Sequence, residues 1–235
     1  MKLSTIYTIL VSAEAFSWVG ISNEKTEKFN CRSSVLFNQQ KRLCSLKSEF
    51  LPAVKRAAKL TRENCKYEMR NNAWDCSDID KLPRLVSKLK TSSPENAYVH
   101  GLSSAQLVTA LYRLCNSGTV GECDVEQVAA FTQQFTGVAS LSKRRLSIAQ
   151  IELHNAKVGR SLAWSSINKI CRCHGASGSC LAKTCFETAP IAPQVARLAT
   201  QKYKQSIEVK IADDRKDLPV MITDQIASNM FLHLH

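Results

Sequence analysis

Residues 171–185 read CRCHGASGSCLAKTC and place four cysteines and one histidine within fifteen positions. Two nested disulfides account for these residue types. Cys173 bonded to Cys180 would close a tight loop, and Cys171 bonded to Cys185 would clamp its base. The stretch therefore predicts a β-hairpin held by two disulfides, and the rest of the chain is interpreted around it.

The tip of this hairpin contains Gly175, Ser177 and Gly178. We expect both glycines to adopt positive φ angles and to leave the backbone around Ser177 uncrowded. A serine held in this way is exposed. From the residues alone, Ser177 is a polar tip residue of a disulfide loop, and its chemistry stays open.

Two other kinds of site fit these residues less well. Zinc sites prefer cysteines separated by two to four residues, whereas one residue separates Cys171 from Cys173. A hydrolase using Ser177 and His174 would need a nucleophile elbow, which ends in glycine and follows a strand, and here the final glycine is replaced by Ser179. The sequence predicts neither a metal site nor an enzyme.

The beginning of the chain and its cysteine content both indicate secretion. Residues 1–15 combine Lys2, an apolar run and an Ala13-Glu-Ala15 cleavage pattern, as expected of a signal peptide. The chain has ten cysteines, an even number, and disulfides persist in oxidising compartments. We expect the protein in the extracellular space and matrix.

The net charge of +12 favours an acidic partner, and a secreted chain meets heparan sulfate rather than nucleic acid. On helices such clusters are commonly just the solvated face. The basic residues gather in two clusters, Lys55, Arg56, Lys59, Arg62 and Lys66, and Lys143, Arg144 and Arg145.

Apolar periodicity predicts a mainly α-helical protein. The third predicted helix would begin at a capping box of Ser103 and Gln106 and stop at Asn116-Ser-Gly118. Asn155 and Gly159 would interrupt the apolar face of the fourth. The predicted helices span residues 35–47, 52–69, 103–116, 141–170 and 194–205, and a strand is expected at 207–211.

The cysteine motif and several upstream segments resemble the Wnt family of signalling ligands. The hairpin stretch CRCHGASGSC, followed by Lys183-Thr-Cys185, is similar to the family signature. Further similarity lies in Cys65 to Trp74-Asp-Cys76, Glu95 to Val99 with Ser103-Ser-Ala105, Leu153-His-Asn155 with Gly159-Arg160, and loosely Tyr203 to Val209. The resemblance covers residues 40–209.

This resemblance implies a disulfide-stapled, saposin-like helical domain with a lipid-bearing hairpin called the thumb. It implies that Ser177 carries a palmitoleoyl ester, which the acyltransferase Porcupine attaches and which enters the cysteine-rich domain of Frizzled. No other cofactor is expected. The expected receptor-contact residues are His174, Gly175, Ala176, Ser177 and Gly178.

The chain departs from the family pattern between Cys115 and Cys123. The family has a Cys-x-Cys and a longer loop there, and this chain lacks both. The resemblance therefore implies that Cys115 and Cys123 pair with each other, and that Cys65 pairs with Cys76. Cys31 and Cys44 remain without an assigned partner.

The resemblance also implies a division of the chain into segments, and it leaves open whether the chain activates its receptor. Residues 1–15 form the signal peptide, 16–211 the helical domain, and 212–235 a tail that matches nothing in the family's C-terminal cysteine-rich domain. That domain grips Frizzled a second time and helps to engage the LDL-receptor-related co-receptor. The alternatives to an agonist are a truncated decoy or antagonist, an inactive fragment, and a saposin-like lipid-binding domain.

Overall fold

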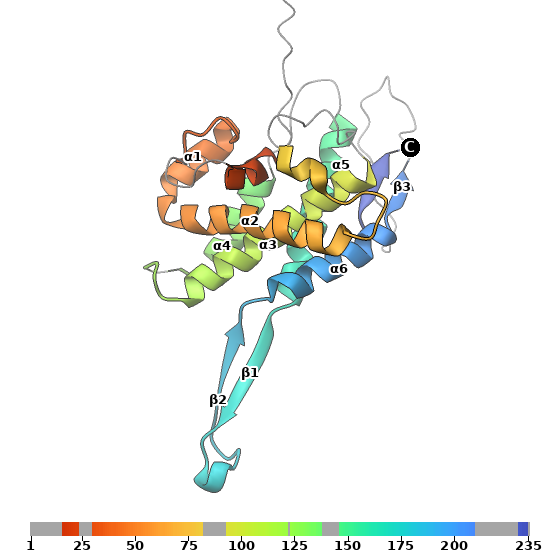
Figure 1. Ribbon diagram of the computed structural model, residues 1–235. Helices are drawn as coiled ribbons and strands as arrows, with labels where there is room; N and C mark the ends of the chain where they lie inside the picture. The colour runs from red at the N-terminus through yellow and green to blue at the C-terminus, as the bar shows by residue number, and fades with distance from the viewer. Residues whose placement is uncertain are drawn as a thin grey trace, which may run out of the picture.

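A computed structural model describes residues 16–23, 30–81, 93–121, 123–137, 146–209 and 230–234. The predicted signal peptide and the basic cluster at Lys143, Arg144 and Arg145 lie outside these ranges. Six α-helices form one body, from which a two-stranded hairpin projects (Figure 1). The helices are α1 (Asn38–Leu46), α2 (Leu51–Met69), α3 (Pro94–Asn116), α4 (Val125–Thr136), α5 (Leu146–Ser165) and α6 (Ala192–Lys204).

Helix α3 lies at the centre of the body and packs against α2, α4, α5 and α6. Its side chains are buried from Asn96 to Tyr112, because neighbouring helices cover it on all sides. A helix buried on all sides lies in the middle of a core, and the buried polar side chains of α3 need partners there. Large buried side chains from other elements fill the space around it, including Trp18, Phe50 and Phe135.

The predicted start of this central helix was wrong. The helix begins at Pro94, and the side chain of Ser93 caps it by accepting a hydrogen bond from the Asn96 N–H at 3.1 Å. Ser103 lies inside the helix and donates to the His100 carbonyl. Gln106 donates to the Ala192 carbonyl on α6 at 3.0 Å. Ser103 thus bonds within its own helix and Gln106 bonds to a neighbouring one, so their capping pattern was misleading.

The fourth predicted helix is shorter than expected. Helix α5 ends at Ser165, and Ile170 belongs to a strand and is exposed. The apolar spacing of Ile167 and Ile170 matched a helical period by coincidence, since Ile170 pairs with Phe186 across the hairpin. Residues 141–145 of the prediction lie outside the described chain.

The remaining helix predictions compare well with the structure. Helix α2 confirms the predicted span 52–69 to within one residue, and α6 matches 194–205. Helix α1 is shorter than predicted, since residues 35–37 precede it. Helix α4, which Asp124 caps by accepting from the Gln127 N–H at 2.7 Å, had not been predicted. Short 3-10 helices occur at Ser17–Asn23, Ser48–Phe50, Ser77–Lys81 and Ala176–Gly178.

Helix α5 runs through Gly159, which was expected to interrupt its apolar face. A Cβ atom on Gly159 would lie 1.9 Å from the carbonyl oxygen of Gly101 on α3. The missing side chain of Gly159 therefore lets the backbone of α5 touch that of α3 at Gly101 where the helices cross. Such close approach is possible only without side chains.

Asn155, the other expected interruption, holds the last described segment of the chain. Its side-chain amide donates to the Leu232 carbonyl at 2.9 Å and accepts from the Leu232 N–H at 2.8 Å. Strand β4 (Leu232–Leu234) also pairs in parallel with β3 (Ile207–Val209). Phe231 is fully buried against Gly101. Sequence analysis found no pattern in this segment.

Candidate functional site: the disulfide hairpin

The hairpin consists of strands β1 (Asn168–Cys173) and β2 (Lys183–Thr188) in antiparallel register. It extends away from the helices, on the side of the body remote from β3 (Figure 1). Both strands are largely exposed along their length. The hairpin therefore presents its tip well outside the helical body.

Two nested disulfides hold the hairpin. Cys171 and Cys185 are direct cross-strand neighbours and are bonded to each other. Cys173 is bonded to Cys180 and closes the tip loop. These are the two pairs that the sequence analysis expected. Together they fix both the register of the strands and the width of the loop.

The tip backbone differs in one respect from expectation. Ser177 and Gly178 have positive φ angles of 54° and 79°, whereas Gly175 has a φ of −67°. Gly175 is required for a steric reason instead. A Cβ atom there would lie 2.0 Å from the Ser179 Oγ and 2.4 Å from the Ser179 carbonyl oxygen. A backbone hydrogen bond joins the same two residues, with Gly175 N–H donating to Ser179 O at 2.8 Å.

The two serines of the tip have different environments. Ser177 is exposed, in a left-handed conformation that an L-residue seldom adopts. The Ser179 Oγ is buried beneath Gly175 and has no hydrogen-bond partner among the described residues. Of the two hydroxyls, that of Ser177 is the one that an outside reagent can reach.

Polar contacts attach the base of the hairpin to the end of α3. The Tyr112 hydroxyl donates to the Glu187 carboxylate at 2.9 Å, and Arg113 donates to the Pro190 carbonyl at 3.3 Å. Asn116 donates to the Glu187 carbonyl at 3.4 Å. Burial and the Glu187 carboxylate raise the pKa of Tyr112, so its hydroxyl remains a donor. Sequence spacing gave no signal for these contacts, which join residues far apart in the chain.

Leu181 is a second tip residue that sequence analysis passed over. Its side chain is 94% exposed, the highest fraction of any large hydrophobic side chain described. The available signal was an apolar residue directly after Cys180 in a loop of small and polar residues.

The other six cysteines are also paired. The bonds are Cys65–Cys76, Cys115–Cys123 and Cys31–Cys44. The first two are the pairs that the sequence analysis expected, and the third was left open. All ten cysteines are thus in disulfides, which leaves no thiolate to bind zinc.

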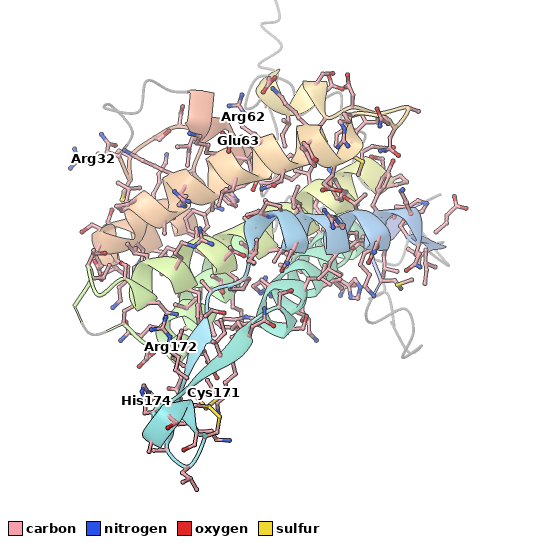
Figure 2. All side chains as sticks on the ribbon, turned by 60° about the horizontal axis from the view of Figure 1, so that its bottom comes forward. Arg32, Arg62, Glu63, Cys171, Arg172 and His174 are labelled. Atoms are coloured by element: carbon pink, nitrogen blue, oxygen red, sulfur yellow. A yellow bond between two sulfur atoms is a disulfide. The ribbon has the colours of Figure 1, made fainter. Side chains whose placement is uncertain are left out.

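Ion pairs occupy part of the basic cluster on α2. Lys59 lies 3.7 Å from Glu63, and Arg62 and Lys66 both contact Asp80. Burial alone would raise the pKa of Asp80, but hydrogen bonds from Lys66 and Arg62 lower it below its ordinary value. Arg62 and Glu63 lie on the helical body, far from the hairpin residues Arg172 and His174 (Figure 2).

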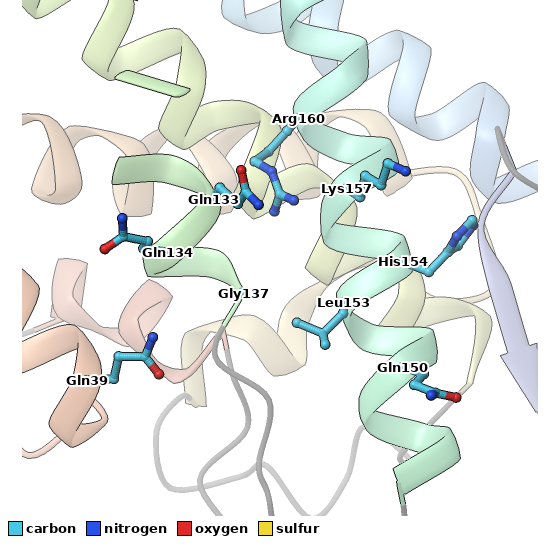
Figure 3. Close-up of a pocket in the computed structure, with 9 residues that line it drawn as sticks. All are labelled: Gln39, Gln133, Gln134, Gly137, Gln150, Leu153, His154, Lys157 and Arg160. Carbon is cyan, nitrogen blue, oxygen red and sulfur yellow. The ribbon is translucent and has the colours of Figure 1, made fainter. Parts of the chain in front are cut away.

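A polar cleft of about 510 Å³ lies between α1, α4 and α5. Burial lowers the pKa of Arg160 in its wall, and this guanidinium donates to the Thr136 hydroxyl at 2.6 Å. Leu153 is the only apolar side chain among the lining residues, so the cleft does not suit an acyl chain (Figure 3). It is lined by Gln39, Gln133, Gln134, Gly137, Gln150, Leu153, His154, Lys157 and Arg160.

No helix within the described residues is long and apolar enough to span a bilayer. Among those same residues, no cluster of three or more histidine, cysteine or acidic side chains is arranged to hold a metal ion.

Comparison with known proteins gives a consistent result. The model of the wnt family matches residues 32–136 and 124–230. Protein Wnt-16 of Mus musculus is 26% identical over 85% of this chain and 64% of its own length. Protein Wnt-11b-1 of Xenopus tropicalis is 27% identical over 83% and 64%, and protein mom-2 of Caenorhabditis elegans is 27% identical over 86% and 67%. The chain thus spans about two thirds of the length of these relatives.

Solved structures support the same fold. The N-terminal domain and linker of Drosophila WntD matches with a TM-score of 0.58 and 19% identity, over 79% of this chain and 95% of that chain. The complex of human WLS with WNT8A matches with a TM-score of 0.58 and 22% identity, over 80% and 72%. Both matches cover about four fifths of this chain, so the two structures share its fold.

Proposed function

Because this chain belongs to the Wnt family, whose members are secreted signalling ligands and not enzymes, we propose that it carries an acyl chain on Ser177 and presents it to Frizzled. Porcupine would attach the palmitoleoyl group during secretion, and the cysteine-rich domain of Frizzled would receive it. The observation that carries this proposal is the exposed Ser177 at the tip of a projecting hairpin held by disulfides.

The physical basis of the proposal is burial of the acyl chain in a receptor groove. Each buried methylene contributes roughly 0.8 kcal/mol, so a long chain supplies on the order of 10 kcal/mol before ordering costs. A rigid support keeps those costs low, because the lipid is already held away from the protein body. The nested disulfides and the short strands provide such a support.

Intact-protein and peptide mass spectrometry of secreted material tests the acylation. We expect a palmitoleoyl mass on the peptide that contains Ser177, and its loss in a Ser177→Ala variant. Ser179→Ala is the matched control, because the Ser179 hydroxyl is buried and should not be a substrate. A secreted chain with an unmodified Ser177 would contradict the proposal.

Receptor binding and signalling are tested with the same variants. Ser177→Ala should reduce binding to a Frizzled cysteine-rich domain by at least a hundredfold, since it removes most of the apolar contact. A reporter assay of the 235-residue chain, alone and added to a full-length Wnt, separates an agonist from a decoy. Activation requires the LDL-receptor-related co-receptor, whereas a decoy lowers the response to the full-length ligand.

Heparan sulfate remains a proposed partner of the basic surface. Arg56 and Lys59 on α2 are exposed and supply positive charge away from the hairpin. Retention on heparin that falls in an Arg56→Ala/Lys59→Ala variant would support this surface as the binding site.

A further inference from the structure

The outer part of the hairpin is purely basic. Between Asn168 and Cys185 the chain contains Lys169, Arg172 and Lys183 and no acidic residue. All three side chains are exposed. The acidic residue of β2, Glu187, lies at the base of the hairpin, where its carboxylate accepts a hydrogen bond from the Tyr112 hydroxyl. Positive charge therefore increases from the helical body towards the tip.

The strand register gathers two of these cations just below the tip loop. Arg172 pairs with Thr184, and Lys183 pairs with Cys173, so they occupy the last two cross-strand pairs. Successive pairs point to opposite faces of a hairpin, which puts one cation on each face. We call Arg172 and Lys183 the basic collar. Lys169 lies about 10 Å closer to the body than Arg172, three residues along the same strand.

The tip beyond the basic collar is apolar where it is most exposed. Leu181 is 94% exposed, and Ser177, the proposed acyl attachment site, lies in the same loop. Figure 2 shows Arg172 beside the stem and His174 at the start of the tip. An apolar end with one cation on each face behind it complements a lipid surface, in which anionic phosphate groups overlie hydrocarbon.

We propose that the hairpin tip docks end-on onto an anionic lipid surface, with Leu181 entering the hydrocarbon and the basic collar contacting headgroup phosphates. The acyl contribution rests on the proposed function, but the basic collar and Leu181 act without it. One acyl chain alone gives only marginal, reversible membrane binding, and stable binding takes a second signal such as basic residues. The collar supplies that signal next to the lipid.

A sulfated polysaccharide would also attract the basic collar, but it explains less of the tip. Polysaccharide binding uses positive charge and gains nothing from an exposed leucine. The exposed cations Arg56 and Lys59 on α2 have no such apolar neighbour in the chain, since Leu60 beside them is only partly exposed. We therefore assign the lipid surface to the hairpin.

Vesicle flotation tests the proposal with the full secreted chain. The vesicles are phosphatidylcholine alone, or phosphatidylcholine with about 30 mol% phosphatidylserine. Arg172→Ala/Lys183→Ala should lower partitioning onto the anionic vesicles by roughly 25-fold, at about fivefold for each cation, and leave neutral vesicles unaffected. Leu181→Ser should lower partitioning onto both kinds of vesicle by roughly tenfold.

Arg56→Ala/Lys59→Ala is the matched control, because it removes the same charge from the helical body. We expect it to leave vesicle binding unchanged. The same measurements in a Ser177→Ala background keep the result independent of acylation, since the preference for anionic vesicles should persist at lower affinity. Disulfide mapping and circular dichroism verify that each variant is folded.

Three results would overturn the inference. The first is equal binding of the wild-type chain to neutral and anionic vesicles. The second is an equal loss of binding in the hairpin variant and in the α2 control. The third is a hairpin variant that loses retention on heparin while its vesicle binding is unchanged, which would assign the basic collar to polysaccharide.

Discussion

His100 is a buried histidine in the centre of α3. Its Nε2 atom lies 3.8 Å from a carboxylate oxygen of Glu152 on α5, which is beyond hydrogen-bond distance, and the Phe16 ring packs edge-on against it at 4.7 Å. Burial lowers the pKa of His100 to about 3. The imidazole is therefore neutral in the folded protein at every pH of the secretory pathway.

This lowered pKa makes stability depend on pH. Between about pH 6.5, the ordinary value, and about pH 3 the unfolded chain binds a proton that the folded chain does not. The contribution of His100 to the free energy of unfolding is therefore fully present above pH 6.5. It falls by about 1.4 kcal/mol for each pH unit below that value. Denaturant unfolding at pH 7, 6 and 5 with intact disulfides measures this slope.

The corresponding variants separate His100 from the other histidines. His100→Gln should flatten the pH dependence, because it removes the titrating group. Burial also lowers the pKa of His233, so a shallow slope of the same sign should remain in this variant. His233→Gln should keep the steeper slope that His100 causes. An unchanged steep slope in His100→Gln would refute the assignment.

At the scale of the element, the hairpin has a disulfide that can be compared with one in the helical body. Cys173–Cys180 and Cys115–Cys123 span separations of 7 and 8 residues, so each closes a loop of nearly the same length. In the chain-entropy description, each constrains the unfolded chain by about 2.5 kcal/mol. Removal of either disulfide should therefore lower the free energy of unfolding by a similar amount. Only the removal of Cys173–Cys180 should also affect the hairpin tip.

Two paired variants use this match. Cys173→Ser/Cys180→Ser should lower the acylated fraction of Ser177 several-fold, because the tip loop is no longer held in one conformation. Cys115→Ser/Cys123→Ser should lower the thermal unfolding midpoint by about as much as Cys173→Ser/Cys180→Ser does, and should leave the proposed acylation intact. Quantitative mass spectrometry of secreted protein measures both. An equal loss of acylation in the two variants would show that general stability, and not the tip loop, governs the modification.

The elements also show what sequence could predict. The hairpin was predictable because closely spaced cysteines and glycines act locally, and the span of α2 because one apolar face repeats at helical spacing. The start of α3 was not predictable, since a fully buried helix has no polar, solvent-facing side. Its Ser103 and Gln106 make hydrogen bonds inside the core and do not cap the helix. Ile170 extended the apolar period of α5 into β1. The contact of Tyr112 with Glu187 needed the tertiary structure.

At the scale of the whole molecule, the last described segment packs against the central helix. Phe231 occupies the space that a side chain at Gly101 would take, since a Cβ atom there would lie 2.2 Å from the Phe231 ring. Asn155 and strand β3 hold the neighbouring backbone. Residues 101, 155 and 231 therefore link distant parts of the chain into one core.

A double-mutant cycle measures this link. Gly101→Ala should destabilise the protein by about 2 kcal/mol through overpacking, and Phe231→Ala by about 3 kcal/mol through an empty space. In the double variant the new methyl group enters the vacated space, so the loss should be smaller than the sum by at least 1 kcal/mol. Chemical unfolding of the four proteins gives the coupling. Strict additivity would mean that Phe231 does not pack on Gly101.

The junction between the hairpin and the helices has a consequence for how the sequence of this protein can evolve. The described contacts there come from Tyr112, Arg113 and Asn116, and two of their three acceptors are backbone carbonyls. A backbone carbonyl is present whatever side chain a residue bears. Sequence drift in the outer hairpin therefore leaves the helical core intact, and new recognition properties can arise at the tip while the inherited scaffold stays the same.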